Sequence, residues 1–289
     1  MSLFGGYPLA PKPPFTPGYE LVGRVEKLGP SVRGLKEDQV VVALNPAFGC
    51  QADHVCVAAD LCVSIGESTD PTEAVSLVLN YLTAHCILHK KARLQKYEKV
   101  LIHSAAGGVG TALLQLGTEL GLTMYGTASR EKHGIVQDLG GIPIDYRSED
   151  FAKVIQKNEP EGLDAAFDPI GGANLRKSYN VLRRGGRVVS YGFAGDKFGG
   201  MGQMAKGVLL VSLLNAWPDG KRVHLCATPS EVRKDNHWYR TTLSELVDRL
   251  ENGKVAPIVG CDEFRFPRHQ QHTVYLWKVV PVERVVLVH

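Results

Sequence analysis

A short apolar run joined to a helical pattern by a glycine-rich turn is the most informative part of this chain. Val100–Ile102 contains no polar residue, as expected for a parallel strand buried on both faces. The run ends in small residues and glycines, after which apolar residues recur at helical spacing. They are Val109, Leu113, Leu116 and Leu120. The pattern predicts a strand, a tight turn and a helix.

Strand-like and helix-like segments then alternate along the chain. The expected strands are Leu122–Ala128, Pro143–Asp145, Gly162–Asp168 and Gly186–Tyr191. The expected helices between them are Glu131–Leu139, Asp150–Asn158 and Ala173–Leu182. Alternation at this spacing predicts an α/β fold with a doubly wound parallel sheet, the Rossmann arrangement.

The two ends of the chain have a different pattern. Short β-branched segments separated by Gly, Pro and Asp predict a small barrel-like β unit before the parallel sheet. These segments are Tyr19–Leu28, Gln39–Leu44 and His54–Val57. A helix is expected over Thr72–Lys91, with Thr69 or Asp70 as N-cap and Pro71 at its first position. Near the other end, Tyr239–Asn252 predicts an amphipathic helix and Val282–Val288 a strand.

Composition and charge narrow the possible functions. The chain has 289 residues, 44% hydrophobic and 22% charged, which is ordinary for a globular protein. A net charge of +3 is too small to favour nucleic acid or an anionic membrane as partner. The apolar run Val208–Trp217 is too short to span a bilayer, and the N-terminus lacks the pattern of a secretory signal. Six cysteines favour reduced thiols in a cytoplasmic protein.

The glycine-rich turn predicts a nucleotide site. It is similar to the dinucleotide fingerprint G-x-G-x-x-G, with Ala105 in place of the first glycine. Backbone amides at such a turn and the N-terminus of the following helix point at a diphosphate, and the helix dipole contributes roughly 0.3–1 kcal/mol. We expect the cofactor to be held there by Ala106, Gly107, Gly108, Val109 and Gly110.

Several further segments, in order along almost the whole chain, carry a family resemblance. They are Pro17–Gly23, Leu79–Ala84, His103–Gly110, Gly126–Ser129, Ile144–Arg147, Phe167–Gly172, Gly185–Arg187 and Tyr191–Gly192. With these segments the sequence resembles the zinc-independent branch of the medium-chain dehydrogenase/reductase superfamily, the quinone oxidoreductase and enoyl reductase group. The resemblance implies a GroES-like, β-rich substrate domain, built from both chain ends, around a Rossmann cofactor domain.

The resemblance also suggests domain boundaries. We expect a first part of the substrate domain at 1–84, a Rossmann NADPH-binding domain at 85–227 and a return to the substrate domain at 228–289. Gly6–Pro8 resembles a segment that in the family follows several strands, so the substrate domain is expected to be shortened at the N-terminus. Glu283 and Arg284 stand where the family has a Gly-Lys pair.

The end of the second strand bears on the choice of cofactor. NAD-specific sites place Asp or Glu there, but this chain has Ser129, Arg130 and Lys132 around that position. These residues are suited to a 2′-phosphate, and Tyr146 resembles the family tyrosine that reaches the same phosphate. The interpretation favours NADPH over NADH. The alternative is that these basic residues form the solvent-exposed start of a helix and bind no phosphate.

Other candidate residues surround the expected position of the nicotinamide. Asn80 and Thr83 lie three residues apart and share a helix face, and the resemblance implies Thr83 as partner of the amide. Simple helix packing is the alternative. Tyr7 is either a polar group on the substrate side of the site or a loop residue. Two strand ends are expected to face the crevice that holds the nicotinamide. The strand-end residues are Asp168, Ile170, Gly171, Tyr191, Gly192 and Phe193.

The sequence does not favour a metal. The zinc-dependent branch of the family has a histidine where this chain has Tyr19, and no Cys-x-x-Cys pair occurs. Cys50, His54 and Cys56 could together bind a metal ion, or they could be ordinary residues of strands. His85 and His89 are four residues apart but lack the glutamate of a His-Glu-x-x-His motif. We therefore expect no metal.

The leading functional hypothesis is a zinc-independent oxidoreductase that transfers hydride from NADPH to a quinone or an α,β-unsaturated carbonyl. One alternative is a nucleotide-binding sensor or structural partner with little turnover. Another is a carrier-linked enoyl reductase of a biosynthetic pathway. No nucleic-acid or membrane partner is expected. A homodimer is expected through an edge strand at Val223–Ala227.

Overall fold

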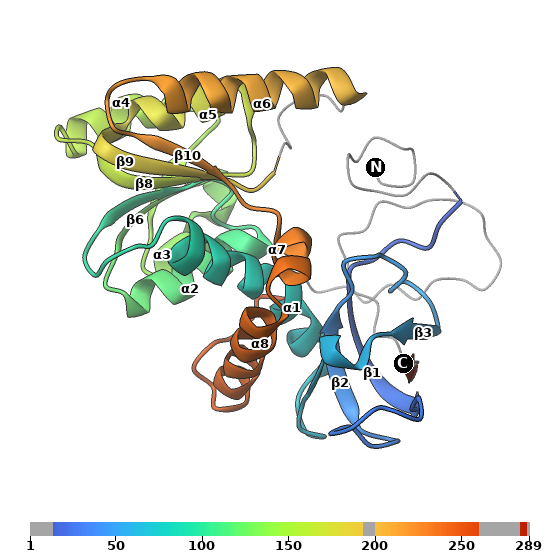
Figure 1. The fold of residues 1–289 in the computed structure, drawn as a ribbon. Coiled ribbons are helices and arrows are strands. Elements are labelled where there is room, and N and C mark those ends of the chain that lie inside the picture. Colours follow the sequence, from blue (N-terminus) through green and yellow to red (C-terminus); the bar gives the residue numbers. More distant parts are fainter. Residues whose placement is uncertain (1–13, 193–199, 260–283, 288–289) are drawn as a thin grey trace. The chain divides into compact units, whose positions relative to one another are not determined.

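The computed structural model describes residues 14–192, 200–259 and 284–287 (Figure 1). Within them the chain forms two compact units. One comprises Thr83–Thr228, and the other combines Pro14–Leu82 with the residues from Pro229 onward. Each unit is therefore described by itself.

The first unit is built on a six-stranded sheet in the order β10-β9-β8-β5-β6-β7, in which every pair of neighbours is parallel. Its strands are β5 (Lys99–Ile102), β6 (Thr123–Ala128), β7 (Ile142–Asp145), β8 (Leu163–Asp168), β9 (Leu182–Ser190) and β10 (Arg222–Leu225). The strand order runs outward in both directions from β5 and β8, which confirms the predicted doubly wound sheet.

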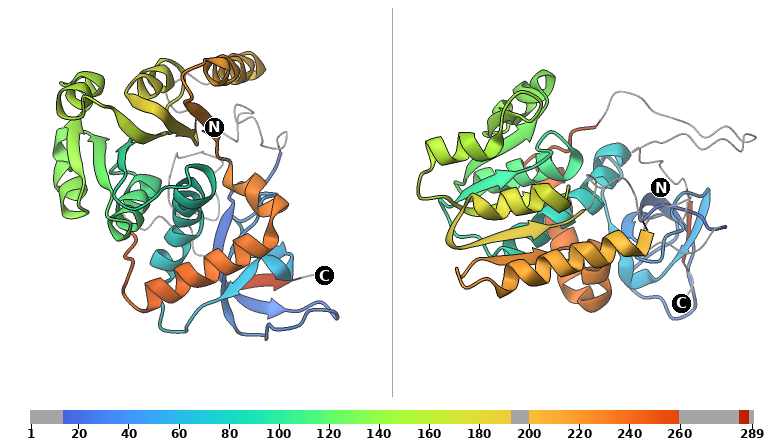
Figure 2. Two further views of the ribbon diagram at one scale, coloured as in Figure 1. Left: turned by 60° about the vertical axis from the view of Figure 1, so that its left-hand side comes forward. Right: turned by 90° about the horizontal axis from the view of Figure 1, so that it is seen from above.

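Helices cover both faces of this sheet (Figures 1 and 2). One face carries α2 (Gly108–Glu119), the 3-10 turn η4 (Arg130–Lys132) and α3 (His133–Asp138). The other face carries α4 (Phe151–Asn158), α5 (Gly172–Asn180) and α6 (Gly200–Ala216). On this second face, Leu101 and Val188 of the sheet pack with Phe151 and Leu175 of the helices. Each such buried side chain stabilises the fold by about 1.5–3 kcal/mol.

The second unit contains a five-stranded sheet in the order β3-β11-β1-β2-β4. Its strands are β1 (Glu20–Lys27), β2 (Val40–Leu44), β3 (His54–Val57), β4 (Cys62–Ser64) and β11 (Arg284–Leu287), with a 3-10 turn η2 (Ala59–Leu61). β11 pairs in parallel with both β1 and β3, whereas the remaining pairs are antiparallel. The predicted N-terminal strands and the strand in the tail are thus confirmed.

Helix α1 (Pro71–His85) begins as predicted. The Asp70 carboxylate accepts hydrogen bonds from the amides of Thr72 (2.8 Å) and Glu73 (3.0 Å), and Pro71 takes the first helical position. The expected single helix to Lys91 is wrong in its last part, because Cys86–Lys91 forms a π-helical segment, η3. No proline or glycine marks this change in the sequence.

Two helices follow the parallel sheet, α7 (Thr228–Lys234) and α8 (Asn236–Glu251). The Asp235 carboxylate caps α8 by accepting from the amide of Trp238 at 3.0 Å. The apolar face predicted for α8 is buried, and the buried Tyr239 hydroxyl lies between the amide of Leu44 and the carbonyl of Leu61. Among the described helices, none combines the length and the apolar character needed to cross a membrane.

Candidate nucleotide-binding site

The glycine-rich turn lies between the end of β5 and the start of α2, and backbone bonds hold it to both neighbouring strands. The amide of His103 donates to the carbonyl of Phe167 on β8 (3.1 Å), and the amide of Ala105 donates to Thr127 on β6 (3.0 Å). Ser104 adopts a positive φ of 53°, so the chain turns sharply at this residue. The turn is therefore fixed to the sheet on both sides.

The start of α2 provides free backbone donors. The first amides of any α-helix lack a partner within the helix, and the N-cap of α2, Gly107, has no side chain that could accept from them. A Cβ at Gly110 would lie 2.3 Å from the carbonyl oxygen of Ser104, so only glycine lets the helix pack this closely on the turn. A cradle of this kind, open at a helix N-terminus, fits a diphosphate.

Ala105 occupies the place of the first fingerprint glycine and is fully buried. Its Cβ would lie 2.7 Å from a Cβ at position 126, where β6 carries a glycine. The space needed for the alanine methyl is thus supplied by Gly126 on the neighbouring strand. The departure from the fingerprint leaves the turn intact.

The predicted 2′-phosphate residues lie at the ends of β6 and β7. Ser129 is buried and precedes η4, whereas Arg130 and Lys132 are exposed. The amide of Tyr146 donates to the carbonyl of Ala128 at 3.4 Å, which places the end of β7 beside the end of β6. Tyr146 as a whole is 57% exposed. The structure therefore brings these four predicted residues to one edge of the sheet.

Two further charged residues in this cluster were not predicted. Arg147 pairs with Glu131 at 3.2 Å, and its guanidinium carbon lies 5.7 Å from the centroid of the Tyr146 ring. The pKa of Glu131 is lowered, mainly by a hydrogen bond from the Ser129 hydroxyl and less by Arg147. Arg147 belongs to a segment that resembles the family, and that was its only signal in the sequence.

Asp145 shapes the turn that presents Tyr146 and Arg147. Its carboxylate accepts from the Ser148 hydroxyl (2.7 Å) and from the amide of Arg147 (3.0 Å), and these bonds lower its pKa. The carboxylate is therefore committed to the backbone of the turn. The cationic side chains remain at the surface.

Asp168, at the end of β8, is fully buried and points into the protein. One carboxylate oxygen accepts from the amides of Ile170 (2.7 Å) and Gly171 (2.9 Å), and the other from Asn174 (2.9 Å) and the Ser178 hydroxyl (3.1 Å). These bonds shape the loop from β8 to α5. The predicted residues Ile170 and Gly171 are held by Asp168 itself.

The end of β9 lies against the same loop. The amide of Tyr191 donates to the carbonyl of Asp168 (3.0 Å), and its hydroxyl donates to the carbonyl of His103 (3.4 Å). Burial raises the pKa of Tyr191 well above its usual value. A Cβ at Gly192 would lie 2.8 Å from the carbonyl oxygen of Pro169, so the two loops are in close contact. The predicted residues Phe193 and Tyr7 lie outside the described residues.

His103 lies beneath these loops and was not assigned a role from the sequence. Its Nδ1 is 3.1 Å from the Thr127 hydroxyl, and its Nε2 is 2.9 Å from the Ser178 hydroxyl. The side chain is 1% exposed, and burial lowers its pKa to about 4, against a smaller opposite effect of Asp168. The imidazole is therefore neutral near pH 7.

Asn80 and Thr83 lie one turn apart on α1. The Thr83 hydroxyl is buried and lies 2.6 Å from the Thr228 hydroxyl, and the Asn80 amide donates to the carbonyl of Ser76 at 3.1 Å. The boundary between the two units falls between Leu82 and Thr83, inside this helix. Both side chains thus have partners within their own unit, and their part in catalysis stays a prediction.

Metal-ligating side chains are dispersed in the part of the chain that the structure describes. No three His, Cys, Asp or Glu side chains gather there as a metal ion would require. The rings of His85 and His89 lie with their centroids 4.5 Å apart and their planes tilted by 43°. Cys50 and Cys62 are buried and unbridged, and burial raises the pKa of each thiol to about 12.

Family profiles match both units. Residues 108–215 match the family described as zinc-binding dehydrogenase, and residues 1–68 match the alcohol dehydrogenase GroES-like domain. A quinone oxidoreductase of Sus scrofa is 31% identical over 259 residues, covering 89% of this chain and 74% of that protein. The fold defines an α/β protein with a Rossmann-like parallel sheet and a GroES-like β unit. The chain belongs to the medium-chain dehydrogenase/reductase superfamily, in its quinone oxidoreductase and enoyl reductase group.

Other relatives have a different name. The synaptic vesicle membrane protein VAT-1 homolog of Danio rerio is 40% identical over 197 residues, covering 67% of this chain and 40% of that protein. The human VAT-1 homolog is 39% identical over 196 residues, covering 67% of this chain and 50% of that protein. The matched region therefore spans half or less of the length of these relatives.

Solved structures agree with the family. The quinone oxidoreductase of Pseudomonas syringae superposes with a TM-score of 0.73 at 27% identity, covering 89% of this chain and 76% of that one. The CurK enoyl reductase superposes with a TM-score of 0.69 at 27% identity, covering 85% and 70%. The Escherichia coli quinone oxidoreductase, solved with NADPH, has a TM-score of 0.75 at 23% identity, covering 87% and 76%, and shows the fold alone.

Proposed function

We propose that this protein is an NADPH-dependent oxidoreductase that reduces a quinone or an α,β-unsaturated carbonyl. The observation that carries the proposal is the pairing of a diphosphate cradle at the start of α2 with a cationic cluster at the ends of β6 and β7. Bound NADPH would supply the hydride. The chain's own residues bind and orient the cofactor.

The cradle would hold the diphosphate through the backbone amides of Ala106, Gly108, Val109 and Gly110, with the dipole of α2 adding to the attraction. Gly107, also predicted as a binding residue, has an amide that already donates to the carbonyl of Ser104 at 2.9 Å, so it shapes the turn. Because these donors belong to the backbone, they are fixed before the ligand arrives and lose little entropy on binding. This part of the site serves NADH and NADPH equally. The choice between the two must come from elsewhere.

The cationic cluster would make that choice. Arg130, Lys132 and Arg147 are exposed around Ser129, and Tyr146 lies beside Arg147. A 2′-phosphate placed here would gain charge-assisted hydrogen bonds, which are about twice as strong as neutral ones. Glu131 is occupied by Ser129 and Arg147, so it is not available as the ribose-binding acid of an NAD site.

The reacting end of the site is proposed from the family resemblance. Thr83 is proposed to orient the nicotinamide amide and Asn80 to lie near the ring, as the family resemblance implies. Their hydroxyl and amide groups have protein partners in the structure. Tyr7 is proposed as a substrate-side hydroxyl on the resemblance alone. The proton that completes reduction of the substrate would come from water or from such a hydroxyl.

The test is a titration with NADPH and NADH, followed by NADPH oxidation with a panel of quinones and enones. We expect NADPH to bind at least tenfold more tightly than NADH, about 1.4 kcal/mol, and to be oxidised by at least one acceptor. Equal dissociation constants for the two cofactors would refute the choice of NADPH. Absence of binding in the folded protein would refute the site.

A second candidate function is nucleotide binding with little turnover, as a sensor or structural partner. It is supported by the similarity to the VAT-1 homologs, which are named as synaptic vesicle membrane proteins. Tight NADPH binding without oxidation by any acceptor would select it. Similarity to the CurK enoyl reductase supports the third candidate, a reductase of carrier-linked enoyl chains, and oxidation only with carrier-linked enoyl substrates would select that one.

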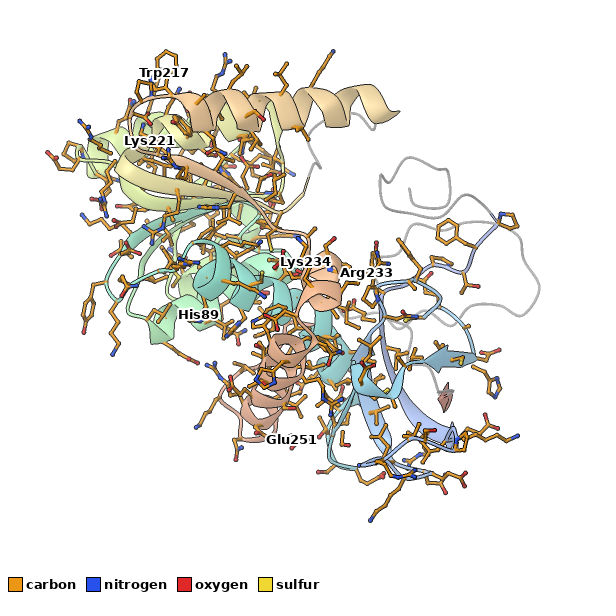
Figure 3. The ribbon with its side chains drawn as sticks, in the orientation of Figure 1. His89, Trp217, Lys221, Arg233, Lys234 and Glu251 are labelled. Carbon is orange, nitrogen blue, oxygen red and sulfur yellow. The ribbon has the colours of Figure 1, made fainter. Side chains whose placement is uncertain are left out.

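We also propose a homodimer through β10, which is an edge strand of the parallel sheet. The exposed side chains of Val208, Leu209 and Leu213 on α6 lie on the helix that packs beside β10, and Trp217 projects away from the sheet (Figure 3). Leu225 on β10 is exposed as well. A second copy would cover this apolar surface. A monomer mass independent of concentration in sedimentation would contradict it.

A cytoplasmic location is proposed on the chemistry of the thiols. Cys50, Cys62, Cys86 and Cys226 are buried and unbridged, as is usual for proteins of a reducing compartment. Localisation of a tagged protein to a secretory compartment would contradict this proposal.

A further inference from the structure

A chain of buried hydrogen bonds runs beneath the two loops of the proposed cofactor site. It begins at the amide of Ser104 in the glycine-rich turn, which donates to the Thr127 hydroxyl at 3.3 Å. It continues through His103 and the Ser178 hydroxyl and ends at the Asp168 carboxylate. The four side chains are between 0% and 3% exposed, so water cannot replace any of these bonds.

The number of available protons decides which group donates in each of these hydrogen bonds. Ser178 has one hydroxyl proton, and the acceptors in reach of it are the Asp168 carboxylate (3.1 Å) and the carbonyl of Asn174 (2.9 Å). Neither acceptor has a proton of its own to give. The Ser178 hydroxyl therefore donates to one of them and accepts from His103, so the imidazole carries its proton on Nε2.

The other ring nitrogen follows from this assignment. In a neutral imidazole protonated on Nε2, Nδ1 is an acceptor, and it takes the hydroxyl proton of Thr127. The Thr127 oxygen is then free to accept the amide of Ser104. Each donor in the chain faces an acceptor, and bonds aligned in one direction strengthen one another.

The two ends of this chain are the two loops of the site. At one end, Ser104 has the positive φ that turns the chain toward the diphosphate cradle. At the other end, the Asp168 carboxylate holds the amides of Ile170 and Gly171. His103 bridges these ends, since its two nitrogens contact hydroxyls on β6 and α5.

We propose that His103, protonated on Nε2, is a positioning residue that couples the glycine-rich turn to the loop between β8 and α5 through the Thr127 and Ser178 hydroxyls. The coupling holds the diphosphate-binding amides in their binding arrangement without any side chain of the network reaching the ligand. This inference rests on the proposed nucleotide function. It goes beyond that function because it assigns a role to three buried residues that would not touch the cofactor.

The first experiment measures binding of ADP-ribose, which contains the diphosphate but neither the 2′-phosphate nor the nicotinamide. Thr127→Val removes the hydroxyl at nearly constant volume and is expected to weaken binding about tenfold, the effect of one lost hydrogen bond. Thr127→Ser retains the hydroxyl and is expected to restore affinity to within about twofold. Thr118→Val makes the same substitution at an exposed position of α2, outside the network, and is the control for the loss of a threonine hydroxyl.

The second experiment reads the proton position directly. Nitrogen NMR of the His103 side chain at pH 7 in the ligand-free protein is expected to show the tautomer protonated on Nε2. Ser178→Ala removes the Nε2 acceptor and is expected to shift both ring-nitrogen signals, while Thr118→Val leaves them unchanged. A tautomer protonated on Nδ1, or an imidazolium, would overturn the inference.

The outcomes separate the two proposals. If the folded wild-type protein binds neither ADP-ribose nor NADPH, the proposed function fails, and the inference that rests on it fails as well. If the wild-type protein binds ADP-ribose and Thr127→Val binds it as tightly as Thr118→Val does, the proposed function stands and the positioning role is refuted.

Discussion

The two polar regions of the parallel sheet differ in almost every physical respect. Beneath the glycine-rich turn, His103, Ser178 and Asp168 are buried and fully engaged with one another. At the ends of β6 and β7, Arg130 and Lys132 are exposed to solvent. In the proposed function, the buried region would set the shape of the backbone that any dinucleotide meets. The exposed region would present the charge that distinguishes one dinucleotide from another.

This difference has energetic consequences. A buried bond is poorly screened, and leaving one partner unsatisfied costs about 1–3 kcal/mol, whereas an exposed ion pair contributes about 0–1 kcal/mol. Changes in the buried region should therefore alter stability and the binding of all dinucleotides. Changes in the exposed region should alter selectivity and leave stability almost unchanged. Four predictions test this division, beginning with the largest effect.

Gly110→Ala should have the largest effect. Its Cβ would lie 2.3 Å from the Ser104 carbonyl oxygen and 2.6 Å from that of Ala105, so the start of α2 must move away from the turn. We expect NADPH and NADH to lose affinity equally, by about 100-fold, as amide bonds to the charged diphosphate are lost. The free energy of unfolding should fall by about 1–3 kcal/mol.

Gly134→Ala on α3 is the matched control, because a Cβ at that position meets nothing within 4 Å. It should leave binding unchanged and stabilise the helix by up to about 1 kcal/mol. Equal affinities of the two alanine variants for NADPH would show that close packing at Gly110 does not shape the cradle.

The second prediction concerns pH. Because burial lowers the pKa of His103 from 6.5 to about 4, the unfolded chain binds a proton in this range and the folded protein does not. The free energy of unfolding should therefore fall as the pH drops from about 6.5 to about 4. Above pH 6.5 the neutral His103 makes no unfavourable contribution to the free energy of unfolding. By pH 4 this one group would have lowered the free energy of unfolding by about 3 kcal/mol.

Chemical denaturation of the wild-type protein and of His103→Gln at several pH values measures this contribution. Gln does not titrate, so its stability should decline less steeply with acid over the same range. Parallel curves for the two proteins would contradict a neutral, buried His103.

Arg147→Ala tests the exposed region. We expect NADPH to bind about fivefold to tenfold more weakly, because one charge-assisted contact to the 2′-phosphate is lost, while NADH affinity and stability stay the same. Lys157→Ala removes a cation at the end of α4 and is the control. A similar loss for both cofactors would place Arg147 in the shared part of the site.

Glu131→Gln should have the smallest effect and the opposite sign. The substitution removes the negative partner of Arg147 at 3.2 Å and leaves an amide of the same size. NADPH should then bind about twofold to threefold more tightly, in keeping with the weakness of exposed pairs, and the gain should shrink at high salt. Weaker NADPH binding by Glu131→Gln would indicate that the carboxylate itself holds the ribose.

Sequence patterns predicted the parallel sheet well, because Val100–Ile102 and the other buried strands appear as short apolar runs bounded by turn residues. They also pointed to the glycine-rich turn before α2 and to the basic residues at the ends of β6 and β7, whose binding roles stay predictions. The π-helical segment Cys86–Lys91 was missed, since its residues have no feature that distinguishes them from the end of α1.

The buried hydrogen-bond network could not be predicted from the sequence for a different reason. His103, Thr127 and Ser178 come from three elements, and each alone is an ordinary polar residue at a strand end or in a helix. Asp168 was predicted at the right strand end, but the pattern does not show which way a carboxylate points. Only the fold shows that it turns inward to hold Ile170 and Gly171.

The position of β11 affects how the protein is made. This strand inserts between β1 and β3, although it lies at the opposite end of the described chain. During synthesis, the ribosome delivers the entire parallel-sheet unit before β11 emerges, so β1 and β3 wait with unpaired backbone edges. Until β11 emerges, these edges can pair with other chains or be bound by chaperones.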